Sequence, residues 1–158
     1  MSMLALVQVL FWAHGLSGAA WFGAIAYRTF AVDRKVAQFF PDSAAHERFS
    51  IHLAHNMRYP VWIGLLTCAV SGSMLMGLKW NPGSSVWVGL MAAKVIVWLL
   101  ACGLFCYVSY VFWPARSFAS QDEFRGFRRR NFELSIGMVV LAALGFLLGQ
   151  SCRLAYTV

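Results

Sequence analysis

The sequence predicts an all-α integral membrane protein, an antiparallel bundle of four helices in a single transmembrane domain. Of its 158 residues, 60% are hydrophobic and only 12% are charged, which is too apolar for a soluble domain of this length. Four apolar runs are each long enough to cross a hydrocarbon core of ~30 Å, which takes about 20 helical residues. The strand-like alternation of apolar and polar residues that would predict a β-barrel is absent.

The four predicted spans follow one another with connections of very different length. They cover residues 4–27, 60–78, 86–113 and 132–150. The third is long enough to tilt or to project beyond the bilayer.

The connections hold most of the charged residues. In the first, residues 28–59, Pro41-Asp42-Ser43 is typical of a helix start, and residues 44–58 are predicted to extend the second span. The second, residues 79–85, is a short turn, and the third, residues 114–131, is basic. The first and third connections together contain ten Lys and Arg residues, whereas Lys79 and Arg153 are the cations expected on the opposite side.

This asymmetry predicts the orientation in the membrane. Loops rich in Lys and Arg stay cytoplasmic, so both termini should be periplasmic in a multi-pass protein of the bacterial inner membrane. No basic stretch followed by an A-x-A site begins the chain, so no cleaved signal peptide is expected. The net charge of +7 does not indicate a nucleic-acid partner, because the charges lie in the gaps between spans.

Two ionisable residues fall inside the predicted spans. With a rise of ~1.5 Å per residue, His14 and Lys94 lie at a similar depth in the outer half of the bilayer, about ten and eight residues from the outer ends of their spans. An ionisable residue in a spanning helix is a candidate functional residue, because lipid offers it no hydrogen bond. We expect both side chains to face the bundle interior on neighbouring helices, with Ser71 and Met74 near the same level.

The acidic residues leave Lys94 without a carboxylate at its depth, because all six belong to the cytoplasmic side or end. Lys94 can therefore snorkel towards the surface, lose its proton, or meet an anion that the chain does not supply. A porphyrin carboxylate is one such anion. His14 would then be an axial iron ligand or a proton carrier, and its ordinary alternative is a hydrogen bond to a neighbouring helix.

Small residues and a second polar group complete the pattern. Gly15, Ala19 and Gly23 are four residues apart, which lets another helix approach closely. A polar group gathers at the cytoplasmic end, where Arg58 and Glu133 can pair as a cap. The group could instead form a ligand or proton-entry site based on His52 or His55; its members are His52, His55, Arg58, Asn131 and Glu133.

Copper is the competing cofactor. Met74 and Met76 at the outer end of the second span are soft donors that suit Cu(I), and the sequence also offers Cys68, Cys102 and Cys106. A cationic Lys94 beside such a site would repel the ion. Methionine and cysteine in apolar helices more often serve as packing residues.

The motifs resemble two related families of membrane proteins. His14, followed by Trp21-Phe22-Gly23 and Tyr27, resembles the first helix of HemJ-type protoporphyrinogen oxidases and of CopD-type copper-resistance proteins. Met91-Ala-Ala-Lys94 resembles the lysine-bearing helix that both families share. Arg128-Arg-Arg-Asn131-Phe-Glu133 resembles the last CopD helix and loosely matches the Arg…Asn-Glu motif of HemJ.

The resemblance implies two different kinds of chemistry. HemJ-like proteins are small four-helix membrane proteins tied to b-type haem, and their important His and Lys would here be His14 and Lys94. CopD-like proteins are associated with moving copper across the inner membrane. If the chain is an enzyme, the resemblance implies a membrane oxidoreductase of the protoporphyrinogen oxidase type.

The leading hypothesis is a haem- or porphyrin-binding redox protein. His14 would be the iron ligand or proton carrier, Lys94 would contact a carboxylate, and Trp21, His55 and Arg58 would complete the cofactor site. The first alternative is copper handling through Met74, Met76 and His14. The second is a non-catalytic accessory subunit that packs against other membrane subunits or against copies of itself.

Overall fold

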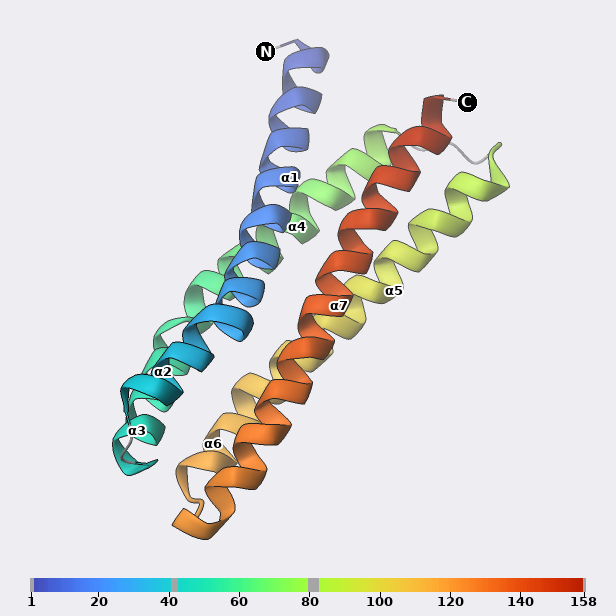
Figure 1. The fold of residues 1–158 in the computed structure, drawn as a ribbon. Helices are drawn as coiled ribbons and strands as arrows, with labels where there is room; N and C mark the ends of the chain where they lie inside the picture. The colour runs from blue at the N-terminus through green and yellow to red at the C-terminus, as the bar shows by residue number, and fades with distance from the viewer. Residues whose placement is uncertain (1, 41–42, 80–82, 158) are drawn as a thin grey trace.

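The computed structural model describes residues 2–40, 43–79 and 83–157 of the chain, and it is built from four long helical columns packed antiparallel (Figure 1). Each column contains a helix that is long and apolar enough to cross a membrane. The predicted all-α, four-span architecture is therefore confirmed.

The first column begins with a polar cap and continues well beyond the predicted span. The side chain of Ser2 accepts a hydrogen bond from the backbone N–H of Ala5, which caps α1 (Met3–Tyr27). The chain then continues through η1 (Arg28–Val32), a π-helical segment, into α2 (Asp33–Phe39).

The second column confirms that a helical extension precedes the second span. α3 (Ser43–Asn56) is separated from α4 (Arg58–Leu78) by the single residue Met57. The predicted helix start at Pro41 and Asp42 lies outside the described residues.

The third column also contains a π-helical segment, and a proline follows it directly. α5 (Ser85–Tyr107) continues through η2 (Val108–Phe112) into α6 (Trp113–Ser117). The N–H of Trp113 donates to the carbonyl of Val108, five residues back, and Pro114 has no N–H to offer to the next carbonyl, that of Ser109. The Ser109 carbonyl is thus left free to bind a side chain.

The fourth column extends further in both directions than the predicted span 132–150. A short 3₁₀ turn, η3 (Gln121–Glu123), leads into α7 (Phe124–Thr157). Part of the basic connection is therefore helical.

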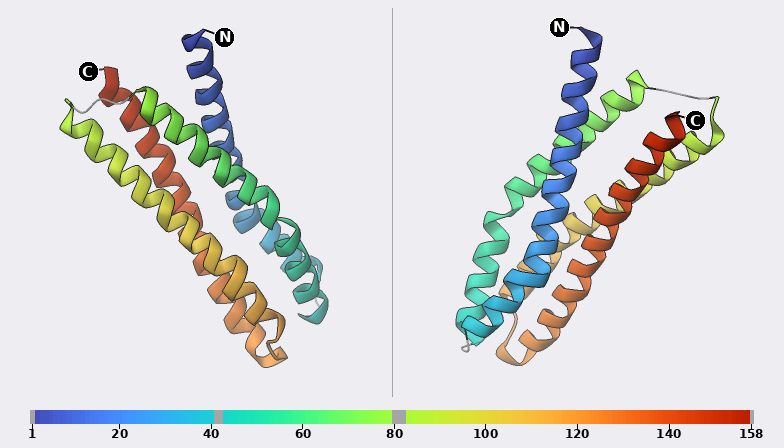
Figure 2. Two further views of the ribbon diagram at one scale, coloured as in Figure 1. Left: turned by 180° about the vertical axis from the view of Figure 1, so that it is seen from behind. Right: turned by 45° about the horizontal axis from the view of Figure 1, so that its top comes forward.

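The columns are arranged as two packed pairs. α1 packs against α4, α5 packs against α7, and α1 also packs against α7 (Figures 1 and 2). The apolar core lies midway along the bundle, where Leu65, Phe105 and Met138 pack with Trp21 and Ile25 around them.

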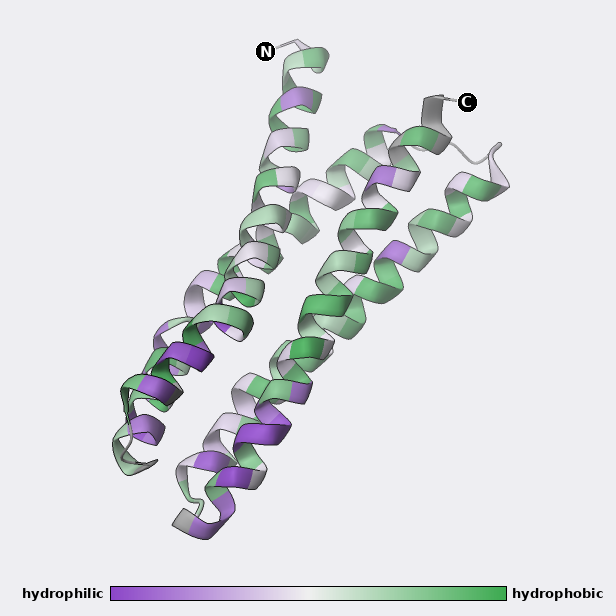
Figure 3. Ribbon diagram, viewed as in Figure 1, coloured by the Kyte–Doolittle hydropathy of each residue, from purple (hydrophilic) through white to green (hydrophobic). Residues whose placement is uncertain are grey.

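The two ends of the bundle differ in polarity. Hydrophilic residues gather at the end that carries α2, α3 and α6, called the basic end below, while both chain termini lie at the opposite, terminal end (Figure 3). This separation along the bundle axis is what an asymmetric membrane environment requires.

The small residues of α1 do not serve the expected purpose. A Cβ atom added at Gly15 or Gly23 would meet nothing within 4 Å, and Ala19 between them is exposed. The stripe faces away from the bundle, so the expected close approach of another helix does not occur there within the described chain. Among the described glycines, the tightest surroundings are those of Gly72 on α4 and Gly149 on α7.

Candidate functional site

His14 and Lys94 meet in the interior of the bundle. Lys94 Nζ lies 3.3 Å from His14 Nε2, although the two residues are 80 positions apart in the sequence. Their helices are not a packed pair, because α1 packs against α4 and α7 while α5 packs against α7. The two side chains therefore reach towards each other across the bundle, and Lys94 does not snorkel to the surface.

Hydrogen bonds determine which His14 nitrogen carries the proton. Nδ1 lies 3.0 Å from the backbone oxygen of Cys68 and 3.2 Å from Ser71 Oγ. A carbonyl oxygen can only accept, so Nδ1 is the donor. The lone pair of a neutral His14 is then on Nε2, where it accepts a hydrogen bond from Lys94.

Residues of α4 hold the His14 ring in place. Ser71 is buried and donates its own hydroxyl hydrogen to the carbonyl of Thr67, so towards His14 it acts as a second acceptor. The thiol of Cys68 donates to the carbonyl of His14 at 3.8 Å. His14 on α1 and Cys68 on α4 thus each donate a hydrogen bond to the backbone carbonyl of the other.

Two glycines make room for the pair. A Cβ atom at Gly72 would lie 2.9 Å from His14 Cε1, and one at Gly149 would lie 3.2 Å from Lys94 Nζ. A larger residue at Gly72 would displace the His14 ring, and one at Gly149 would displace the Lys94 amine. Neither glycine was predicted as a site residue, because small residues in a spanning helix are typical of helix packing.

The structure supplies no carboxylate to Lys94. Among the described residues, the acidic side chains belong to α2, α3, η3 and the first turns of α7, all of them at the basic end. Lys94 therefore lies inside the bundle with an imidazole as its polar neighbour.

Two indole N–H groups are also without acceptors. Nε1 of Trp21, two turns from His14 on α1, and Nε1 of Trp98, one turn from Lys94 on α5, are buried and make no hydrogen bond to described residues. An unsatisfied buried donor costs about 1–3 kcal/mol. Each of the two helices that carry the His14–Lys94 pair thus has a buried indole N–H that can donate a hydrogen bond to a ligand.

His14 and Lys94 are of the residue types that would hold a haem or porphyrin. A ligating histidine usually donates its second N–H to a carbonyl, as His14 Nδ1 does, and its Nε2 lone pair is then the ligand position. Lys94 is the cation that would bind a carboxylate. Lys94 Nζ lies 3.3 Å from His14 Nε2. The flexible Lys94 side chain would therefore have to move away before Nε2 could bind an iron.

The two methionines predicted for copper differ in exposure. Met74 is 45% exposed, on the outer surface of α4, while Met76 lies half-buried two residues later. Within the described part of the chain, no three His, Cys, Asp or Glu side chains gather to hold a metal ion.

The predicted pairing of Arg58 with Glu133 is wrong. Arg58 donates to the free carbonyl of Ser109 at 2.7 Å and stacks on Tyr110, whereas Glu133 pairs with Arg129 at 3.0 Å on the exposed face of α7. The reason is that Pro114 leaves an acceptor beside Arg58, while Glu133 finds a partner one turn away on its own helix.

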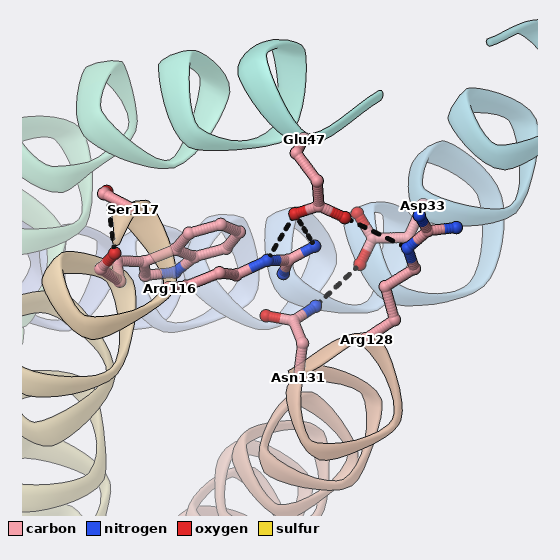
Figure 4. Close-up of polar contacts among 7 residues, drawn as sticks. Asp33, Glu47, Arg116, Ser117, Arg128 and Asn131 are labelled. Atoms are coloured by element: carbon pink, nitrogen blue, oxygen red, sulfur yellow. Dashed lines mark hydrogen bonds and ion pairs between the residues drawn. The ribbon is translucent and has the colours of Figure 1, made fainter. Parts of the chain in front are cut away.

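A buried ion cluster, which the sequence analysis missed, joins the columns at the basic end (Figure 4). Glu47 of α3 accepts from Arg116 of α6 at 2.7 Å and from Arg128 of α7 at 3.0 Å. The side chains of Glu47 and Arg116 are 3% and 2% exposed. One signal could have found Glu47: Ile51 and Ala54 continue its helical stripe, which marks that face of α3 as apolar.

Asp33 and Trp113 extend this cluster. Asp33 lies 3.8 Å from Arg28. It also accepts a hydrogen bond from Asn131 at 3.5 Å (Figure 4). The guanidinium groups of Arg28 and Arg116 lie over the Trp113 ring, 5.4 and 4.7 Å from its centroid.

The two histidines of α3 that were predicted as ligands lie outside both sites. His52 and His55 are exposed, and His52 Nε2 accepts from the side chain of Asn56 at 3.0 Å. The buried histidine of this helix is His46, beside Glu47.

Nothing matches this chain among the family models, the curated proteins or the solved structures with which it was compared. The resemblance to the HemJ and CopD families rests on the short motifs around His14, Lys94 and Asn131.

Proposed function

We propose that this multi-pass membrane protein binds a haem or porphyrin within its bundle and has a redox role. His14 would be the iron ligand or the proton carrier, and Lys94 would bind a carboxylate of the group. The proposal rests on the chemistry of one half-buried pair within the observed four-span architecture.

One observation supports the proposal most strongly. An imidazole lone pair and a lysine amine meet at 3.3 Å inside an apolar bundle, at a depth where the described chain offers Lys94 no carboxylate. Ionisable residues are costly at that depth and mark cofactor, ion or proton sites. The unused indole donors of Trp21 and Trp98 add further capacity for an acceptor-bearing ligand.

The protein residues have separate tasks in this proposal. A bound haem would supply one-electron redox chemistry. Cys68 orients the His14 ring through Nδ1, which directs Nε2 to the interior. The apolar core of Leu65, Phe105 and Met138 separates the pair from the basic end, so protons would reach the pair from the terminal end.

The absorption spectrum of the detergent-purified protein tests this proposal. We expect a b-type Soret band that shifts on reduction with dithionite, because a histidine-ligated iron changes its electronic state. The band should be lost in His14→Ala and weakened in Lys94→Met, while Lys79→Met at the terminal end should leave it unchanged. Circular dichroism of each variant checks that the helices are retained.

Other outcomes would overturn the proposal. A band that disappears in His52→Ala or His55→Ala but survives in His14→Ala would move the ligand to α3. A colourless protein that carries copper would favour copper handling through Met74 and Met76. A colourless, metal-free protein that co-purifies with other membrane subunits would favour an accessory role.

We further propose that the basic end faces the cytoplasm of a bacterial inner membrane, as the positive-inside rule predicts. Arg129, whose side chain is 84% exposed at that end, and the exposed Lys79 at the other end form a matched pair of probes. In intact cells, a membrane-impermeant maleimide should label Lys79→Cys and leave Arg129→Cys unlabelled, with the native cysteines replaced by serine in both. The reverse labelling pattern would show the opposite orientation.

A further inference from the structure

A cavity of about 90 Å³ lies at the basic end, between the apolar core and the Glu47 ion cluster. All four helical columns contribute to its lining. Its polar lining residues are Arg28 and Thr29 from η1, Arg58 from α4, Ser109 from η2, and Asn131 and Ser135 from α7. The two π-helical segments thus meet around one cavity.

The cavity has cations in its wall and no matching anion. Arg28 and Arg58 both line it, and no carboxylate is among its described lining residues. Glu47 is already bound to two other arginines, and Asp33 lies 3.8 Å from Arg28. Arg58 makes no ion pair with any described residue.

Arg58 is held in place with an unused donor. Its Nη2 donates to the Ser109 carbonyl at 2.7 Å, and its guanidinium carbon lies 4.9 Å from the centroid of the Tyr110 ring. Its Nε is buried and has no acceptor among the described residues. A fixed guanidinium with a free buried N–H, in the wall of a cavity, is prepared to bind an acceptor.

We propose that this cavity binds one oxyanion group, a phosphate or a carboxylate. Planar guanidinium groups match the geometry of both through paired N–H donors. A volume of about 90 Å³ corresponds to a few water molecules at ~30 Å³ each, which suits one small anionic group. The hydroxyl groups of Thr29, Ser109 and Ser135 add neutral donors.

The group can come from two sources. The cavity lies between the apolar core and the basic end of the bundle, and basic cavities between spanning helices bind anionic headgroups. A free small anion has the same chemistry. This inference is independent of the haem proposal, because the apolar core separates the cavity from His14.

Calorimetric titration of the detergent-purified full chain with sodium phosphate tests the inference. Sodium acetate is titrated in parallel, and sodium chloride at equal ionic strength provides the baseline. We expect saturable binding of phosphate or acetate that weakens at least about tenfold in Arg58→Gln, because charge-assisted hydrogen bonds are lost. Arg129→Gln, an exposed arginine at the same end, should bind as the wild type does.

Two further measurements keep the test decisive. Competition by phosphatidic acid in mixed micelles, and not by phosphatidylcholine, would identify a lipid headgroup as the source. If Arg58→Gln does not fold, Arg58→Lys retains the charge without the planar fork and should weaken binding several-fold. Absence of binding by both anions and by the lipid, or equal binding by Arg58→Gln and the wild type, would overturn the inference.

Discussion

Replacing Glu47 by alanine is expected to lower the free energy of unfolding by about 3–5 kcal/mol, the usual cost of removing one partner from a buried ion pair. Glu47 accepts from Arg116 at 2.7 Å and from Arg128 at 3.0 Å, and Arg116 is almost fully buried. Without the carboxylate, Arg116 keeps its charge in a low-dielectric environment. The substitution would also release α3 from α6 and α7, because no other described ion pair joins these elements.

Glu133→Ala provides the matched control. Glu133 pairs with Arg129 at 3.0 Å, but both side chains are mostly exposed and lie one turn apart on α7. Such pairs contribute about 0.3–0.5 kcal/mol. Thermal or denaturant unfolding of both variants in the same detergent measures the difference. Equal stability of Glu47→Ala and Glu133→Ala would show that the buried cluster does not stabilise the bundle.

Replacing Gly72 by alanine is expected to displace the His14 ring. The added Cβ would lie 2.9 Å from His14 Cε1 and 3.2 Å from Nδ1, so the ring has to move away from the Cys68 carbonyl. Overpacking of this kind typically costs about 1–3 kcal/mol. We therefore expect a less stable protein that has also lost the orientation of His14.

Gly64→Ala on the same helix separates this clash from the general effect of the substitution. A Cβ atom at Gly64 would meet nothing within 4 Å, so alanine there should be neutral or stabilise by up to about 1 kcal/mol through helix propensity. The measurements are unfolding in detergent and, under the haem proposal, the Soret band. If Gly72→Ala matched Gly64→Ala in both, the packing of His14 on Gly72 would be unimportant.

The sequence by itself determined the four spans, because the signal for them is local. A bilayer requires long apolar segments with every backbone group bonded inside the helix, and this requirement is visible in composition alone. The similar depth of His14 and Lys94 also followed from the sequence, since the rise per residue is constant. The helical extension before α4 followed from the helix-start pattern Pro41-Asp42-Ser43.

Only the tertiary structure decided how the helices are rotated and paired. Apolar residues surround the spans on nearly every side, so the sequence does not show which face of a span points inward. The contact between His14 and Lys94 depends on that rotation, and so does the space that Gly72 and Gly149 leave for the two side chains. For the same reason, the small-residue stripe of α1 faces away from the bundle.

The polar contacts at the basic end could not be predicted from the sequence either, because their partners lie far apart along the chain. Glu47 binds arginines 69 and 81 positions away, and many arginines of the two basic connections were equally plausible partners. Arg58 binds Ser109 and not Glu133, because Pro114 leaves the Ser109 carbonyl on the third column without a backbone donor. Depth along the membrane is encoded residue by residue, whereas contacts around the bundle axis depend on how all four columns pack together.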